Sequence, residues 1–186
     1  MKLPQRDARL SGVKLIIETP PREEQLAFNR ARWAEVLADE SLAEFPGRVE
    51  TNGFGNILMM PLPSGSHSHR TMKIQLELLR RLGGMALPEC PVSTMDGVRA
   101  ADVGWYSEDR FHLVEGQQAF EIAPEICVEV LSPSNREAEM NLKKELYFEA
   151  GAVEVWFCGE DGSITFHSPS GPLPESARCL GFPAVI

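Results

Sequence analysis

Ile126-Cys127-Val128-Glu129-Val130-Leu131 is a short apolar run with a single acid inside it. Proline-containing segments bound it on both sides, so the pattern predicts a buried β-strand. Side chains alternate between the two faces of a strand, which places Glu129 on the same face as Cys127 and Leu131. A carboxylate among apolar neighbours is unfavourable unless a partner compensates its charge. The run therefore predicts either a buried ion pair with a lysine or arginine, or a metal site.

Length and composition predict one ordinary globular domain. The chain has 186 residues, of which 43% are hydrophobic and 24% charged, enough for one full core but not for two large domains. We expect a single domain over 1–186, with an N-terminal arm over 1–22 and a core over 23–186. No apolar run is long enough to cross a bilayer, and the first residues lack the apolar segment of a signal peptide, so we expect a cytoplasmic protein with no membrane partner.

The cysteines and the net charge narrow the functional classes. Four cysteines are scattered without a Cys-x-x-Cys pair, which argues against a zinc site or a disulfide framework and fits a reducing compartment. The net charge of −9 is unusual for a protein that binds nucleic acid, because such proteins normally present a basic surface. A group of metal-binding carboxylates would shift the charge in the same direction, so the charge leaves both possibilities open.

Apolar periodicity predicts interleaved helices and strands, hence a mixed α/β domain with one central sheet. We expect helices over 22–43, 69–82 and 136–150, and strands over 13–17, 48–51, 57–60, 86–92, 98–105, 126–131, 153–157 and 163–167. The segment 61–68 reads as a loop. The second helix has two apolar stripes, at 72, 76 and 79 and at 74, 78 and 82, so both sides are expected to be covered. Ser134 and Glu137 are spaced as a capping box for the third helix.

The third helix carries a lysine on the side that should face the core. Met140, Leu146 and Tyr147 lie on that side at helical spacing, and Lys143 falls among them. Lys143 either lays its stem over apolar surface with its ammonium in water, or points its ammonium at Glu129 from a helix that returns across the same sheet. Lys144, one position further round, is the second choice for this role.

Asp102 is the third candidate, because it lies inside an apolar strand-like run between Ala101 and Val103. Such an aspartate can cap a bulge or turn. Together with Glu129, however, it could hold a divalent cation such as Mg²⁺. An ion and an ammonium at one point are suited to activating water and stabilising charge on phosphate, which is phosphodiester hydrolysis.

These residues lie within a pattern that resembles the Uma-two family of restriction-endonuclease-like proteins, part of the PD-(D/E)XK nuclease superfamily. The resemblance covers most of the chain from about residue 23. It rests on residues 124–135, Glu139-Met140, Lys143, Tyr147 and residues 151–156, and upstream on Glu50, residues 61–69, Gly97-Val98 and Ala101-Asp102-Val103.

The resemblance implies a central mixed β-sheet flanked by helices, with Asp102 and Glu129 as ligands of Mg²⁺ or Mn²⁺. The superfamily lysine expected two residues after the glutamate is Leu131 here. The family lysine is found instead on the following helix, at the position of Lys143. Glu50 and His69 are implied as supporting residues of the same pocket. DNA is the implied substrate, and a homodimer is plausible by analogy with other members of the superfamily.

Three functional hypotheses remain open at this point. In the first, the chain is a divalent-metal-dependent nuclease that uses Asp102, Glu129 and Lys143. In the second, it is a catalytically inactive module that binds a partner or nucleic acid on the same fold. In the third, Glu129 and Lys143 form a buried structural ion pair. His67 and His69 have a spacing that suits a metal pair on a strand, but loop histidines are usually solvated.

Overall fold

The computed structural model describes residues 20–186. Residues 1–19, which include most of the expected arm and the strand expected over 13–17, lie outside the described residues. The helices are α1 (Arg22–Ala38), α2 (Glu40–Ala43), α3 (Gly65–Leu82), α4 (Glu108–Phe111) and α5 (Glu137–Glu149). The strands are β1 (Gly47–Thr51), β2 (Ile57–Pro61), β3 (Met85–Thr94), β4 (Gly97–Tyr106), β5 (Ile126–Val130), β6 (Glu154–Cys158), β7 (Ile164–Ser168) and β8 (Gly171–Leu173). The expected mixed α/β architecture is confirmed.

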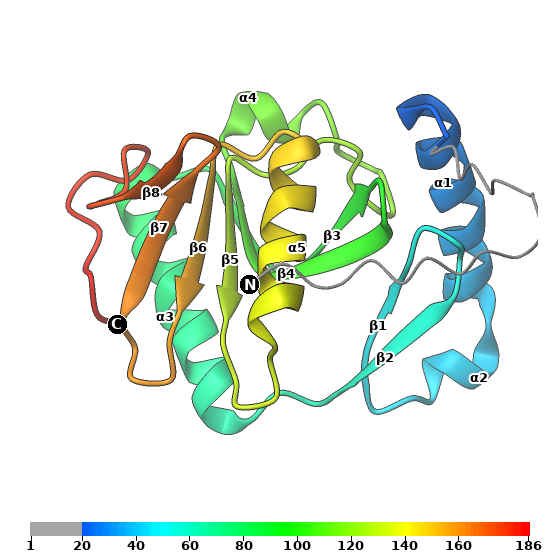
Figure 1. The fold of residues 1–186 in the computed structure, drawn as a ribbon, viewed down its shortest axis with the longest axis horizontal. Helices are drawn as coiled ribbons and strands as arrows, with labels where there is room; N and C mark the ends of the chain where they lie inside the picture. Colours follow the sequence, from blue (N-terminus) through cyan, green and yellow to red (C-terminus); the bar gives the residue numbers. More distant parts are fainter. Residues whose placement is uncertain (1–19) are drawn as a thin grey trace, which may run out of the picture.

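A six-stranded mixed sheet organises this part of the chain (Figure 1), in the order β3-β4-β5-β6-β7-β8. Strands β5 and β6 pair in parallel, whereas the other neighbouring pairs are antiparallel. A parallel pair needs a crossover connection, and α5 supplies it between β5 and β6. The helix that carries Lys143 is therefore anchored beside the strand that carries Glu129.

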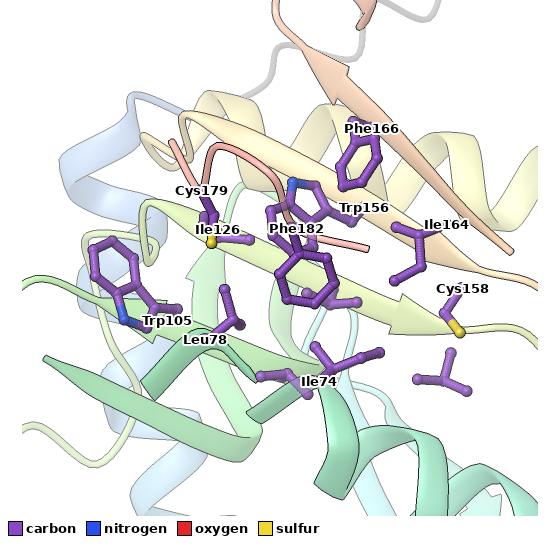
Figure 2. Packing of buried hydrophobic residues seen from close by; sticks show 13 residues of the cluster. Ile74, Leu78, Trp105, Ile126, Trp156, Cys158, Ile164, Phe166, Cys179 and Phe182 are labelled. Atoms are coloured by element: carbon purple, nitrogen blue, oxygen red, sulfur yellow. The ribbon is translucent and has the colours of Figure 1, made fainter. Parts of the chain in front are cut away.

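The alternation predicted for residues 126–131 is confirmed, because β5 separates two layers of core. Its even-numbered residues pack with Ile74 and Leu78 of α3 on one face of the sheet. Cys127 packs on the other face with Tyr147 of α5. Figure 2 shows the α3 layer, in which Trp156 and Phe182 lie over the same face. Glu129 faces the α5 layer.

The hairpin of β1 and β2 forms a separate two-stranded sheet beside β4. Helix α1 covers it through a small core of Trp33, Val36 and Val98. The backbone N–H of Val98 in β4 donates to the Thr51 hydroxyl in β1 at 3.0 Å. This bond fixes β1 against β4 and brings residues of β1 to the edge of the central sheet.

Two of the expected helix boundaries are wrong. The helix expected over 22–43 is interrupted at Asp39, whose extended backbone ends α1 and whose side chain caps α2 by accepting from Ser41 N at 2.9 Å. The helix expected from residue 69 begins four residues earlier, because the Ser64 hydroxyl accepts from His67 N at 3.2 Å. Half of the segment expected to be a loop is therefore helical.

Two details of side-chain environment also differ from expectation. Only one stripe of α3 is covered: Ile74 and Leu78 are buried, whereas Leu76 is 58% exposed because no described element lies over it. The capping box expected at Ser134 is absent, since Arg136 occupies the N-cap of α5 and makes no side-chain cap bond. Asn135 instead accepts from Ser132 N at 2.7 Å and holds the loop before the helix.

The remaining strand and turn expectations mostly hold. Gly151 follows α5 with a φ of 104°, a conformation that favours glycine, and ends the helix as expected. The short strand β8 was not expected, because its sequence is interrupted by Pro172 and a proline suits only an edge strand. No helix among residues 20–186 is long and apolar enough to span a membrane.

Candidate active site

Asp102 lies in the middle of β4, and its carboxylate is almost fully buried. It is 3% exposed, and its Oδ2 accepts a hydrogen bond of 2.7 Å from the backbone N–H of Val130 in the neighbouring strand. The Arg48 guanidinium lies 2.7 Å from Oδ1. The ring Nε2 of His67 lies 3.1 Å from Oδ2. The aspartate therefore belongs to a polar network and does not cap a turn.

Glu129 projects from β5 towards α5, as its strand position predicted. The Lys143 ammonium lies 2.9 Å from its Oε1, and the Tyr147 hydroxyl donates to the same oxygen at 2.7 Å. Within residues 20–186, no donor is bonded to Oε2. Glu129 also borders a polar hollow, so one carboxylate oxygen is held by α5 and the other is available for a ligand.

Lys143 is buried, with 3% of its surface exposed, and its ammonium lies between two acids. Besides Glu129 it reaches Glu50 Oε1 at 3.2 Å and the Ala100 carbonyl at 3.1 Å. The ammonium therefore points into the core and not into solvent. Glu50 comes from β1 and also accepts from the backbone N–H of Ala100 at 3.1 Å, which ties the hairpin to the centre of β4.

Two of the residues named from the sequence lie away from this cluster. His69 is exposed on α3. The histidine that contacts Asp102 is His67, because helical residues two positions apart point in different directions. Lys144 donates to Asn141 at 3.2 Å and lies 3.6 Å from Glu145, both exposed residues of α5. Of the residues named from the sequence, the cluster thus contains Glu50, Asp102, Glu129 and Lys143. His69 and Lys144 lie outside it.

Sequence reasoning missed Arg48 and set His67 aside as a solvated loop histidine, which is wrong because its side chain is only 14% exposed. Arg48 precedes Glu50 by two positions on β1, so the two side chains share a face, and that alternation was a usable signal. The sequence signal for His67 is Ser64, which can be recognised as a helix N-cap. A helix that starts at Gly65 turns His67 towards β4. Its Nδ1 is buried and has no hydrogen-bond partner in the described part of the chain.

The electrostatics of the two acids differ. Burial raises the pKa of Glu129 to about 7, since Lys143 offsets only part of the desolvation and the Asp102 charge adds to the rise. Burial opposes ionisation of Asp102 as well, but the hydrogen bond from His67 and the Arg48 charge hold its pKa below its usual range. Asp102 is therefore the permanently charged acid of the pair.

The acids of the cluster favour the charged forms of the basic residues. Burial works against the Lys143 ammonium, yet the charges of Glu129 and Glu50 keep its pKa above its ordinary value. The hydrogen bond to Asp102 raises the pKa of His67. Acids and bases in this cluster therefore stabilise one another, as close opposite charges do in a low-dielectric environment.

A hollow of about 270 Å³ opens over this network. The buried or half-buried polar residues Arg48, His67, Asp102, Glu129 and Lys143 form its floor, and its rim consists of Met60, Pro61, Leu62, Pro63, Ser64, Glu89, Val130, Ser132, Pro133, Ser134, Asn135, Glu139 and Met140. Most of the rim comes from the β2–α3 and β5–α5 connections and the ends of the elements beside them. A ligand in the hollow would contact side chains from both layers at the end of β5.

The donor set fits a divalent cation of the hard, oxygen-seeking type. Residues 20–186 contain no group of three or more His, Cys, Asp or Glu side chains already arranged around one point. Mg²⁺, however, is usually held by one or two carboxylates, with waters and substrate phosphate completing its shell. Asp102 and Glu129 offer two carboxylates to the same hollow, and Glu129 has an oxygen free of protein donors.

Comparison with known proteins now identifies the family. The Uma2 family, described as "Putative restriction endonuclease", matches residues 40–181. The chain belongs to the Uma2 family. The matched segment contains all the cluster residues, from Arg48 to Lys143, so the family resemblance noted from the sequence is confirmed.

A solved structure supports the fold assignment. The crystal structure of "a putative nuclease belonging to DUF820" from Anabaena variabilis superposes with a TM-score of 0.62 at 17% sequence identity. The match covers 78% of this chain and 89% of the other. At this identity the match shows the fold alone, which is that of a restriction-endonuclease-like domain. No curated protein matches the chain. Family membership supports a nuclease-like function.

Proposed function

We propose that the protein is a divalent-metal-dependent nuclease that hydrolyses phosphodiester bonds of DNA. The observation that carries the proposal is the convergence of Asp102, Glu129 and Lys143, from β4, β5 and α5, beneath one hollow. These are two carboxylates and one amine from three separate elements, and the opposite charges of Lys143 and Glu129 hold α5 and β5 together. Membership in a family described as restriction endonucleases supports the assignment to this reaction class.

The residues take distinct roles in this proposal. Asp102 and the free Oε2 of Glu129 would hold Mg²⁺ or Mn²⁺ at the floor of the hollow. The ion would supply a water of lowered pKa and would neutralise charge developing on the phosphate. Lys143 fixes the orientation of Glu129 through the 2.9 Å contact and contributes a positive charge to the site. Glu50 in turn holds the ammonium in place from the other side.

The test is cleavage of DNA by the purified protein with Mg²⁺ or Mn²⁺, using both double-stranded and single-stranded substrates. Glu129→Ala should abolish the metal-dependent cleavage while circular dichroism shows an unchanged fold. Glu145→Ala is the matched control, because Glu145 is 71% exposed and its one ion pair within residues 20–186 is with Lys144. Metal-dependent cleavage that survives Glu129→Ala would refute the assignment.

The alternative is a catalytically inactive module that binds a partner or nucleic acid on the same fold. The net charge of −9 favours it, and so does the pairing of Asp102 and Glu129 with protein cations. Calorimetric titration with Mn²⁺ separates the two functions. A nuclease binds the ion and loses this binding in Asp102→Asn, whereas a binding module has no need for the ion.

A further inference from the structure

Arg48 occupies the part of the site that an ion would need. Its Nη1 lies 2.7 Å from Asp102 Oδ1 and 3.0 Å from Glu89 Oε2, and Nη2 lies 3.6 Å from Glu50 Oε1. The side chain is only 21% exposed. The guanidinium therefore neutralises three acids, of which Asp102 and Glu89 line the hollow.

The contacts of Asp102 leave a single oxygen for a cation. Oδ2 accepts from Val130 N and lies against His67, whereas Oδ1 is held by Arg48. A divalent ion bound at Oδ1 would lie within a few ångströms of the guanidinium. Two like charges that close repel each other strongly in a buried site. The ion and the present position of Arg48 therefore exclude each other.

Glu89 provides a second acceptor for the same guanidinium, nearer to solvent. Its side chain is 46% exposed at the edge of the hollow. It is the one non-glycine residue in the described part of the chain with a positive φ, 46°. The pairs Pro88–Val103 and Cys90–Ala101 flank it in the β3–β4 ladder, which places it opposite Asp102. Backbone strain of this kind is often retained at functional sites.

The guanidinium is also incompletely bonded where it lies. Arg48 Nε is buried and has no hydrogen-bond partner among residues 20–186. A group that lacks one of its bonds gives up less on moving than a fully bonded one. Arg48 therefore has a partner to move to, Glu89, and an unsatisfied donor in its present position.

We propose that Arg48 is a displaceable internal counter-ion of the metal site. It neutralises Asp102 when no ion is bound and moves onto Glu89 when the ion takes Oδ1. This inference rests on the proposed function, because it assumes that Asp102 binds the ion. It explains how Asp102 and Glu50, the two buried acids that Arg48 contacts, remain stable in the protein before the ion binds. It also implies that the contact between Arg48 and Asp102 weakens metal binding.

The test is Mn²⁺ titration by calorimetry of the metal-free protein at one pH, with no substrate present. Arg48→Met should tighten Mn²⁺ binding at least about tenfold, because the competing charge is gone. Arg99→Met is the matched control: Arg99 also contacts Glu50, at 3.3 Å, but its other acidic partner is Asp96 rather than Asp102. It should change the affinity by less than about threefold.

A second pair of variants tests the destination of the guanidinium and does not disturb the buried floor. Glu89→Gln should weaken Mn²⁺ binding about fivefold in the wild-type background and have little effect in Arg48→Met, since Arg48 is the residue that contacts both Glu89 and Asp102. Glu139→Gln removes the same charge from the exposed rim of the hollow. It should have the same small effect in both backgrounds.

The outcomes separate this inference from the proposed function. Binding in the wild type that is lost in Asp102→Asn but unchanged or weaker in folded Arg48→Met would overturn the counter-ion and leave the metal site standing. Equal effects of Glu89→Gln in both backgrounds would overturn it as well. Absence of Mn²⁺ binding in every variant would overturn both proposals. Tighter binding in Arg48→Met, with the predicted coupling to Glu89, would support both.

Discussion

The ammonium of Lys143 lies 2.9 Å from Oε1 of Glu129, with both residues about 97% buried. The contact joins a helix to the strand that precedes it and crosses the interior of the domain. Removing one member of such a pair leaves an uncompensated buried charge, which is far more destabilising than losing a surface pair.

Lys143→Met should therefore lower the free energy of unfolding by about 3–5 kcal/mol. Lys144→Met, one position along the same helix, should change it by less than about 0.5 kcal/mol, because the ammonium of Lys144 contacts exposed Asn141 and Glu145 of its own helix. Urea unfolding followed by circular dichroism measures both. Equal losses in the two variants would show that Lys143 is not the buried partner.

The raised pKa of Glu129 predicts a pH dependence of stability. Because its folded pKa of about 7 exceeds the ordinary 4.5, the native state holds a proton that the unfolded chain releases. The stability from this group is complete below pH 4.5 and is lost as the pH rises through 7. The change is on the order of 3 kcal/mol.

Glu129→Gln should remove this dependence, so the difference in unfolding free energy between wild type and variant should vary between pH 4.5 and 7.5. His67, whose pKa is also raised, adds a loss only above pH 6.5. Asp102, whose pKa is lowered, contributes to the pH dependence of stability only below pH 3.8. Parallel pH profiles of wild type and Glu129→Gln would contradict the pKa assignment.

The 2.7 Å hydrogen bond from Tyr147 should lower the pKa of Glu129. The bond stabilises the ionised carboxylate, so Tyr147→Phe should move the Glu129 transition to higher pH and lower stability by about 1–2 kcal/mol. Tyr106→Phe is the control, since the Tyr106 hydroxyl donates to the Ile122 carbonyl at 2.9 Å. It should lower stability similarly and leave the Glu129 transition unchanged, as pH-dependent urea unfolding would show.

Glu154 is a buried acid with a structural role, and it should be separable from the site acids. Its carboxylate accepts hydrogen bonds from Trp156 Nε1, Ser176 Oγ and Arg178 N at 2.7–2.8 Å. The bonds from Ser176 and Arg178 hold the C-terminal segment against β6. Glu154→Ala leaves these donors without an acceptor and should cost about 3 kcal/mol or more of stability. Mn²⁺ affinity, measured below the unfolding temperature, should stay unchanged. A parallel loss of Mn²⁺ binding would place Glu154 in the metal site.

Local patterning was sufficient to predict most elements of the fold and the inward direction of Glu129 and Lys143. Period-two alternation in β5 placed Glu129 on one face, and helical spacing in α5 placed Lys143 on the buried side. Both signals depend on residues within one element, so a single sequence contains them. Asp102 stood out as an acid inside an apolar run and was a candidate partner of Glu129, and the family resemblance then supported that pairing and added Glu50.

The tertiary structure alone decided which further side chains complete the cluster. Arg48 and His67 reach Asp102 from β1 and α3, and their separations of 54 and 35 residues leave no local pattern that pairs them. The choice of His67 over His69 depends on a hydroxyl cap that shifts the start of α3 by one turn. The sequence determines which residues face inward, because that depends on local periodicity. The meeting of charges from distant elements depends on how the layers pack, which only the fold specifies.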